Sequence, residues 1–184
     1  MASLSIVIPT IGRDTLERAD RSAARCAQRV IRVADNCPDV AADVCGYFGA
    51  AGLARNAGVD LVDTTFVGFC DDDDELVPDV YRRAVNAHAD ADLILHSAWH
   101  PQLGPIPRPG WMTEFGNTTV AMTVRTSTFR ELGGFIAGFP FTFKGEDFEL
   151  FRRFVDHGKR VVASPEVAYL IRPEETRWQS PTAT

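Results

Sequence analysis

The sequence predicts a single α/β domain with a mostly parallel central sheet and helices on both faces. Its first half alternates short apolar, β-branched runs with helix-like segments, the pattern of a doubly wound sheet. Its 184 residues correspond to one domain and suffice to bury roughly 70% of the surface of the unfolded chain. No internal repeat or linker divides the chain, so one domain over 1–184 is expected.

The elements follow from local signals along the chain. Ser5-Ile6-Val7-Ile8 is an apolar run ended by Pro9, which predicts a buried first strand. Asp14 and Glu17 form a capping-box-like start for a helix that ends near Gln28. Further strands are predicted at 30–34, 65–70, 93–96, 118–124, 161–162 and 167–171, and further helices at 52–59, 78–89, 126–132 and 146–156. The proline- and glycine-rich stretch 99–116 predicts a long loop, a feature that is usually functional.

Composition excludes several classes of protein. The chain is 45% hydrophobic and 24% charged, as in ordinary soluble globular domains. A net charge of −6 argues against a nucleic acid as partner. The N-terminus lacks the basic region of a signal peptide, and no apolar run approaches the roughly 18 residues of a membrane span. The four cysteines show no CxxC spacing, which indicates reduced thiols in a cytoplasmic protein.

The acidic run Asp71-Asp72-Asp73-Asp74-Glu75 is the sharpest feature of the sequence. It follows directly on the predicted strand 65–70, and in open α/β sheets ligands bind at the carboxyl ends of strands. Adjacent carboxylates repel one another, and a divalent cation with oxygen ligands relieves that repulsion. The spacing of an EF-hand loop and its central glycine are absent. The run therefore predicts a Mg²⁺ or Mn²⁺ site that is completed by substrate phosphates.

Six short motifs occur in a fixed order around this run. They are Ser5-Ile6-Val7-Ile8-Pro9-Thr10 with Arg13, Val33-Ala34-Asp35-Asn36, Gly52-Leu53-Ala54-Arg55-Asn56-Ala57-Gly58, Phe69-Cys70-Asp71-Asp72-Asp73-Asp74, Phe129-Arg130-Glu131-Leu132-Gly133-Gly134-Phe135, and Gly145-Glu146-Asp147-Phe148-Glu149-Leu150. Over about 3–172 the chain resembles the GT-A glycosyltransferases of the family 2 type, which are Rossmann-like nucleotide-diphospho-sugar transferases.

This resemblance implies a role for each motif. It implies that Pro9, Thr10, Arg13 and Asp35 lie at the nucleobase of the donor, with Arg55 and Asn56 beside it. It implies that Asp71 and Asp72 bind ribose and the metal side of the diphosphate, and that Asp73, with Asp71, ligates Mn²⁺ or Mg²⁺. It implies that the pair Glu146-Asp147 contains the catalytic base, for which Asp147 is the first choice.

The chemistry of Arg55 and of the pair Glu146-Asp147 allows two interpretations for each. An arginine can stack on a nucleobase or donate to its carbonyls, and it can equally form a salt bridge on the surface of a helix. Glu146 and Asp147 fall in the first turn of a predicted helix, where the helix dipole favours ionised carboxylates. The same ionised carboxylates, aimed into a cleft, can accept a proton from an acceptor hydroxyl.

The resemblance also implies the reaction and its partners. It implies transfer of a sugar from a UDP-, GDP- or dTDP-sugar to a hydroxyl of a glycan, lipid-linked sugar or protein, with inversion at the anomeric carbon. Donor binding would occupy about 1–98 and acceptor binding and catalysis about 99–172, before a polar tail at 173–184. The predicted loop 99–116 is then the acceptor contact or lid, with Trp99 and Trp111 as possible sugar platforms and His96 or His100 as a possible ligand contact.

Two other hypotheses remain open at this point. Family members often carry a histidine after the last strand, and the comparable stretch 169–173 here has none. A catalytically silent module that binds a nucleotide sugar or a metal is therefore the second hypothesis. A nucleotidyltransferase would need a glycine-rich phosphate loop after the first strand, and Pro9-Thr10-Ile11-Gly12-Arg13 does not supply one. Without membrane segments, processive polysaccharide synthesis is not expected.

Overall fold

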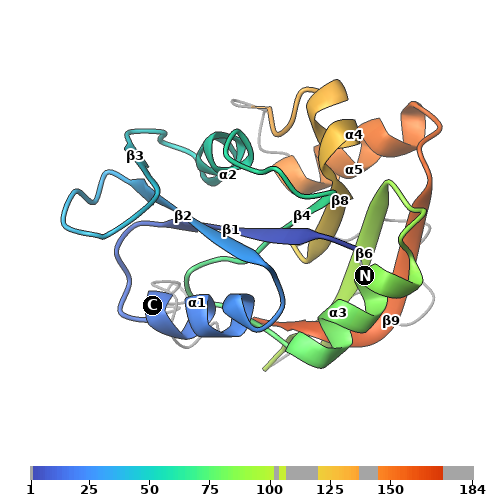
Figure 1. Ribbon diagram of the computed structural model, residues 1–184, viewed down its shortest axis with the longest axis horizontal. Coiled ribbons are helices and arrows are strands. Elements are labelled where there is room, and N and C mark those ends of the chain that lie inside the picture. The colour runs from blue at the N-terminus through green and yellow to red at the C-terminus, as the bar shows by residue number, and fades with distance from the viewer. Residues whose placement is uncertain (1, 102–103, 107–119, 137–144, 172–184) are drawn as a thin grey trace, which may run out of the picture.

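A computed structural model describes residues 2–101, 104–106, 120–136 and 145–171. Within these residues nine strands form one sheet in the order β3-β2-β1-β4-β8-β6-β9-β5, with β7 paired to β6. Helices α1 and α3 lie on one side of the sheet, and α2, α4 and α5 lie on the other (Figure 1). The predicted α/β class, with helices on both faces, is confirmed.

The described elements have the following bounds. The strands are β1 (Leu4–Thr10), β2 (Arg29–Asp35), β3 (Val44–Gly46), β4 (Phe66–Phe69), β5 (Glu75–Leu76), β6 (Leu93–His100), β7 (Gly104–Ile106), β8 (Met122–Arg125) and β9 (Val161–Leu170). The helices are α1 (Leu16–Ala24), α2 (Ala51–Val59), α3 (Pro78–Ala87), α4 (Thr126–Glu131) and α5 (Glu146–Asp156).

The first half of the sheet is parallel, as the alternating pattern predicts. Strand β1 pairs in parallel with β2 and β4, and β2 pairs in parallel with β3. All seven residues of β1 are buried, because the strand is central and covered on both faces. Since neighbouring parallel strands end at the same edge, Thr10, Asp35 and the residues after Phe69 come together there.

The second half of the sheet is mixed rather than parallel. Strand β8 runs antiparallel to both of its neighbours, β4 and β6, whereas β6 and β9 are parallel. The expectation of a mostly parallel sheet therefore holds on one side of β4 only. The pattern of the second half gave no sign of this, because a short buried apolar strand looks the same in either direction.

Several predicted segments differ in the structure. The expected capping box of Asp14 and Glu17 is not formed, because α1 starts at Leu16 after Thr15 without a side-chain capping bond, and the helix ends at Ala24 rather than near Gln28. The predicted loop 99–116 begins as strand, since β6 continues to His100 and turns back as β7, whose Pro105 lies at the sheet edge where a missing N–H is tolerated. The predicted pair 161–162 and 167–171 is the single strand β9. Its pairing with β6 slips around Ser164–Val167, which accommodates Pro165. Residues 102–103, 107–119 and the tail 173–184 lie outside the described residues, so most of the expected lid, with Trp111, does too.

The remaining expectations concern the thiols and the membrane. All four cysteines are free, as predicted, although Cys45 is exposed. Among the described helices, none has the length and apolar character needed to cross a bilayer.

Candidate active site

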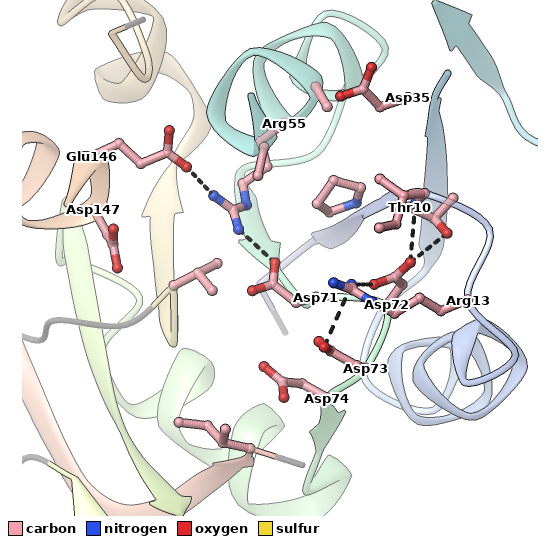
Figure 2. Close-up of a pocket in the computed structure, with 16 residues that line it drawn as sticks. Thr10, Arg13, Asp35, Arg55, Asp71, Asp72, Asp73, Asp74, Glu146 and Asp147 are labelled. Carbon is pink, nitrogen blue, oxygen red and sulfur yellow. Dashed lines mark hydrogen bonds and ion pairs between the residues drawn. The ribbon is translucent and has the colours of Figure 1, made fainter. Parts of the chain in front are cut away.

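A cavity of about 480 Å³ opens at the carboxyl ends of β1, β2 and β4 (Figure 2). It lies where ligands bind in open α/β sheets. Its lining brings together residues from both halves of the chain. They are Pro9, Thr10, Ile11, Arg13, Asp35, Ala51, Ala54, Arg55, Asp71, Asp72, Asp73, Asp74, Val120, Glu146, Asp147 and Ile171. Of the residues that the resemblance assigns to the donor, the metal or the catalytic base, every one except Asn56 is among them.

The four aspartates of the acidic run line the cavity, and most of them are buried. Asp72, Asp73 and Asp74 are buried, which is unusual for carboxylates. The backbone N–H of Asp71 donates to the hydroxyl of Tyr169 in β9 at 3.0 Å. Sequence reasoning missed Tyr169, because a tyrosine in an apolar strand carries no signal of its partner.

Asp72 fixes the segment that follows β1. Its carboxylate accepts hydrogen bonds from the Thr10 hydroxyl at 2.7 Å, from the backbone N–H of Ile11 at 3.2 Å and from the Arg13 guanidinium (Figure 2). Asp72 is almost fully buried, so these partners replace the water that it loses. The structure thus places Asp72 as an internal anchor of the cavity wall, although it also lines the cavity.

Removal of this anchor is expected to destabilise the protein. Asp72→Ala leaves the Thr10 hydroxyl, the Ile11 N–H and the Arg13 guanidinium without their acceptor, at a cost of roughly 3 kcal/mol in the free energy of unfolding. Urea denaturation measures this change. Asp79→Ala, which breaks an exposed pair with Arg82, is the matched control and should cost no more than about 1 kcal/mol. A loss in Asp72→Ala as small as in the control would contradict the anchoring role.

Arg55 lies between the two acidic groups rather than free at a nucleobase. One terminal nitrogen donates to Asp71 at 2.6 Å and the other to Glu146 at 2.7 Å (Figure 2). Its side chain is only 5% exposed. The alternative of a salt bridge on the helix surface needs correction, because the ion pairs of Arg55 are buried and long-range, whereas the expected contact with the donor stays a prediction.

Asn56 does not reach the cavity. Its side-chain amide donates to the carbonyl of Phe135 at 2.8 Å and accepts from the N–H of Phe135 at 2.9 Å. These two bonds tie α2 to the segment after α4. Asn56 is therefore not part of the cavity lining where it was expected, because Arg55 and Asn56 direct their side chains to different partners.

Asp35 lines the cavity from the end of β2. Its carboxylate also accepts hydrogen bonds from the backbone N–H groups of Phe48 at 2.7 Å and Gly49 at 3.2 Å. Asp35 therefore orders the turn before α2 while it faces the side of the cavity that Pro9 and Thr10 line. His96, in contrast, is fully buried against Tyr81 and Thr123 and does not line the cavity.

Asp147 is a cavity-lining carboxyl group with a raised pKa. It lies in the first turn of α5, and its burial raises the pKa of its carboxyl group to about 6. A hydrogen bond from its own backbone N–H and the charge of Arg55 lower this pKa in part, whereas Asp71 and Glu146 raise it. A carboxylate with a pKa near neutrality is a better proton acceptor than an ordinary aspartate.

The acidic lining can supply only some of the ligands that a divalent cation needs. Around the described cavity, seven carboxyl groups face two arginines, and both arginines are already paired with carboxylates. Burial raises the pKa of Asp73, and the charges of Asp71 and Asp72 raise it further against the opposing effect of Arg13. Among the described residues, no three acidic, histidine or cysteine side chains are arranged as a complete metal site. One or two carboxylates suit Mg²⁺ or Mn²⁺, which keep their other positions for water and phosphate.

Comparison with known proteins finds likeness in structure but not in sequence. No protein-family model and no curated protein sequence matches the chain. The structure of S. aureus TarS 1–349 superposes with a TM-score of 0.70 at 17% identity, over 94% of this chain and 61% of that one. The longer S. aureus TarS structure gives a TM-score of 0.72 at 18% identity, over 94% of this chain and 37% of that one.

This chain has a GT-A-like fold. At this level of identity the likeness concerns the fold, and the chain spans less than two thirds of each of these TarS structures. Two further TarS 1–349 structures hold UDP and UDP-GlcNAc, with TM-scores of 0.69 for both.

Proposed function

We propose that this protein is a glycosyltransferase that moves a sugar from a nucleoside-diphosphate sugar to an acceptor hydroxyl, with Asp147 as general base. The observation that carries the proposal is the joining, in one cavity, of the ends of β1 and β2, the acidic run after β4 and the acidic pair of α5. The likeness to TarS, which binds UDP-GlcNAc, supports a nucleotide sugar as donor. Assignment to the family 2 type rests on the sequence motifs.

The proposed reaction is a single displacement with inversion. Asp147 accepts the proton of the acceptor hydroxyl as that oxygen bonds to the anomeric carbon. The bond from this carbon to the phosphate oxygen breaks, and the nucleoside diphosphate leaves with the electron pair. A divalent cation held by Asp73 and Asp71, when bound, would neutralise charge on the leaving diphosphate. Pro9, Thr10 and Asp35 would hold the nucleobase.

The negative lining supports a donor-dependent metal site. A diphosphate that enters among seven carboxyl groups is repelled, and no lining arginine of the described cavity is unpaired. We expect Mn²⁺ alone to bind weakly and to bind at least tenfold more tightly when UDP is present. Isothermal titration of Mn²⁺ with and without UDP measures the difference. Equal Mn²⁺ affinity in both titrations would refute a shared site.

The pKa of Asp147 predicts the pH dependence of the reaction. The base acts only when deprotonated, so kcat/KM should rise about tenfold per pH unit below pH 6 and level off above it. Initial rates between about pH 3.5 and 8 at subsaturating donor measure this limb. A limb near pH 4, where an unshifted aspartate titrates, would speak against Asp147 as the base.

The deciding experiment is a donor panel. Purified protein is incubated with UDP-, GDP- and dTDP-sugars, with Mn²⁺ or with EDTA, and release of nucleoside diphosphate is measured with and without candidate acceptors. Turnover of one donor, faster with Mn²⁺, is the expected result. Binding of a donor with neither hydrolysis nor transfer would instead establish the silent nucleotide-sugar module.

A further inference from the structure

Helix α2 carries the contacts that join the two acidic groups of the cavity. Arg55 uses one terminal nitrogen for Asp71, after β4, and the other for Glu146, at the start of α5. A planar guanidinium can hold two carboxylates at once because its terminal nitrogens diverge. The remaining nitrogen, Nε, is buried and has no hydrogen-bond partner within the described part of the chain. Two of the five N–H donors of the guanidinium are thus committed to these carboxylates, and the side chain is only 5% exposed.

Two other residues of α2, Gly52 and Asn56, also contact the segments that Arg55 holds, namely the start of α5 and the residues after α4. Gly52 lies one turn before Arg55, and a Cβ atom at this position would stand 2.4 Å from a carboxylate oxygen of Glu146. Only glycine therefore permits this close approach. Asn56 binds both backbone groups of Phe135, and the Phe135 ring lies 5.4 Å from the Arg55 guanidinium, within range of a cation–π contact.

We propose that Arg55 is a positioning residue, which ties Asp71 to Glu146 and thereby holds the first turn of α5 with Asp147 facing the acidic run. This inference rests on the proposed function. Within the acidic pair, Glu146 is the residue that Arg55 holds in place, and Asp147 is the proton acceptor. Arg55 fixes the separation between the general base Asp147 and the donor side of the cavity. Arg55 itself makes no contact with the nucleobase.

The kinetic test compares Arg55→Met and Arg55→Lys with Arg32→Met, which breaks an ion pair with Asp20 remote from the cavity. Arg55→Met should lower kcat at least 100-fold while the KM for the donor changes less than threefold. Arg55→Lys should recover part of this loss, because one ammonium can keep one of the two carboxylates. Arg32→Met should change both constants less than threefold. A kcat of Arg55→Met within threefold of wild type would overturn the proposal.

The affinity of a neutral nucleoside separates positioning from base recognition. Of uridine, guanosine and thymidine, the one that wild type binds most tightly is titrated into each variant. Its Kd should change less than threefold in Arg55→Met. A tenfold weaker Kd with an unchanged kcat would return Arg55 to the nucleobase and overturn the proposal.

A stability measurement tests the bridge without any turnover. Urea unfolding of Arg55→Met, Glu146→Gln and the double variant should show coupling of at least tenfold in the unfolding equilibrium constant. The matched cycle of Arg32→Met and Asp20→Asn should show less than fivefold, as expected for a partly exposed pair. Coupling no larger than in this control would refute the bridge. If Arg55→Met does not fold, Arg55→Lys takes its place in the cycle.

Gly52→Ala provides a variant in which every charge remains. The added methyl group occupies the place of the Glu146 carboxylate, so kcat should fall at least tenfold with an unchanged nucleoside Kd. An unchanged kcat would show that the place of Glu146 does not matter. If wild type turns over no donor, the proposed function fails, whereas the unfolding cycle still decides whether Arg55 joins the two acidic groups.

Discussion

Asp147→Asn is expected to lower kcat by about 10²–10⁴-fold, the range for loss of a general base, with donor affinity unchanged. The substitution keeps the size of the side chain and removes the oxygen that accepts the proton. Because the base acts on the acceptor in the transition state, the Kd of the donor has no reason to change. Single-turnover rates at saturating donor and a separate donor titration measure the two effects independently.

Asp147→Asn should lower the activity but not the stability of the protein. The pKa of Asp147 is about 6 in the folded protein and 3.8 for an unperturbed aspartate, so the folded state binds the proton more tightly. The cost of burying this charge therefore appears as pH rises from about 4 to 6 and persists above pH 6. At pH 8 the Asn variant should melt at the same temperature as wild type or higher. A clear drop in Tm would show that the ionised carboxylate stabilises the fold.

Glu146→Gln is the control within the acidic pair. Glu146 is held by Arg55, so its loss should disturb the position of the helix without removing the proton acceptor. Its kcat should therefore fall less than that of Asp147→Asn, and an acid limb should remain, at a somewhat lower pH because the charge of Glu146 raises the pKa of Asp147. If Glu146→Gln were the inactive variant and Asp147→Asn active, the base would be Glu146.

Asp73→Ala is expected to lower turnover at least 10³-fold and to remove the Mn²⁺-dependent part of donor binding. Asp73 lines the cavity, and the Arg13 guanidinium, 3.6 Å from its carboxylate, is already bonded to Asp72, while Arg18 donates to the backbone carbonyl of Asp73 at 2.9 Å. The Asp73 carboxylate therefore has capacity left for a cation. Titrations of UDP with Mn²⁺ and with EDTA, together with donor turnover, measure the loss.

Glu75→Gln is the neighbouring control for Asp73→Ala. Glu75 ends the acidic run but pairs with Arg18 at 2.8 Å and does not line the cavity. Its Mn²⁺-dependent donor affinity should stay within about threefold of wild type, as expected for a partly exposed ion pair worth at most about 1 kcal/mol. If both substitutions were tolerated equally, the metal assignment would be wrong.

The order of motifs was sufficient to predict the α/β class and most members of the cavity. Runs such as Ile6–Ile8 and Phe66–Phe69 are buried strands because their apolar side chains leave no polar face for water. The acidic run follows β4, and parallel strands end at one edge, so Asp71 had to lie near Thr10 and Asp35. These are consequences of local pattern and of the geometry of parallel sheets.

Partners distant in sequence could not be predicted in this way. The run of four aspartates looks uniform, yet Asp72 binds the segment after β1, and Asp71 shares Arg55 with a glutamate 91 residues from that arginine. Tyr169 and the direction of β8 carried no local signal either.

The sequence alone determined where the carboxylates of this protein gather, because hydrophobic periodicity and strand ends are properties of short segments. Only the tertiary structure decided which carboxylate anchors a loop, which shares an arginine and which has a raised pKa. That choice depends on burial and on the charges that distant segments bring within about 3 Å, as the Arg55 contacts with Asp71 and Glu146 show. A buried charge is stable only with a partner, and the fold selects that partner.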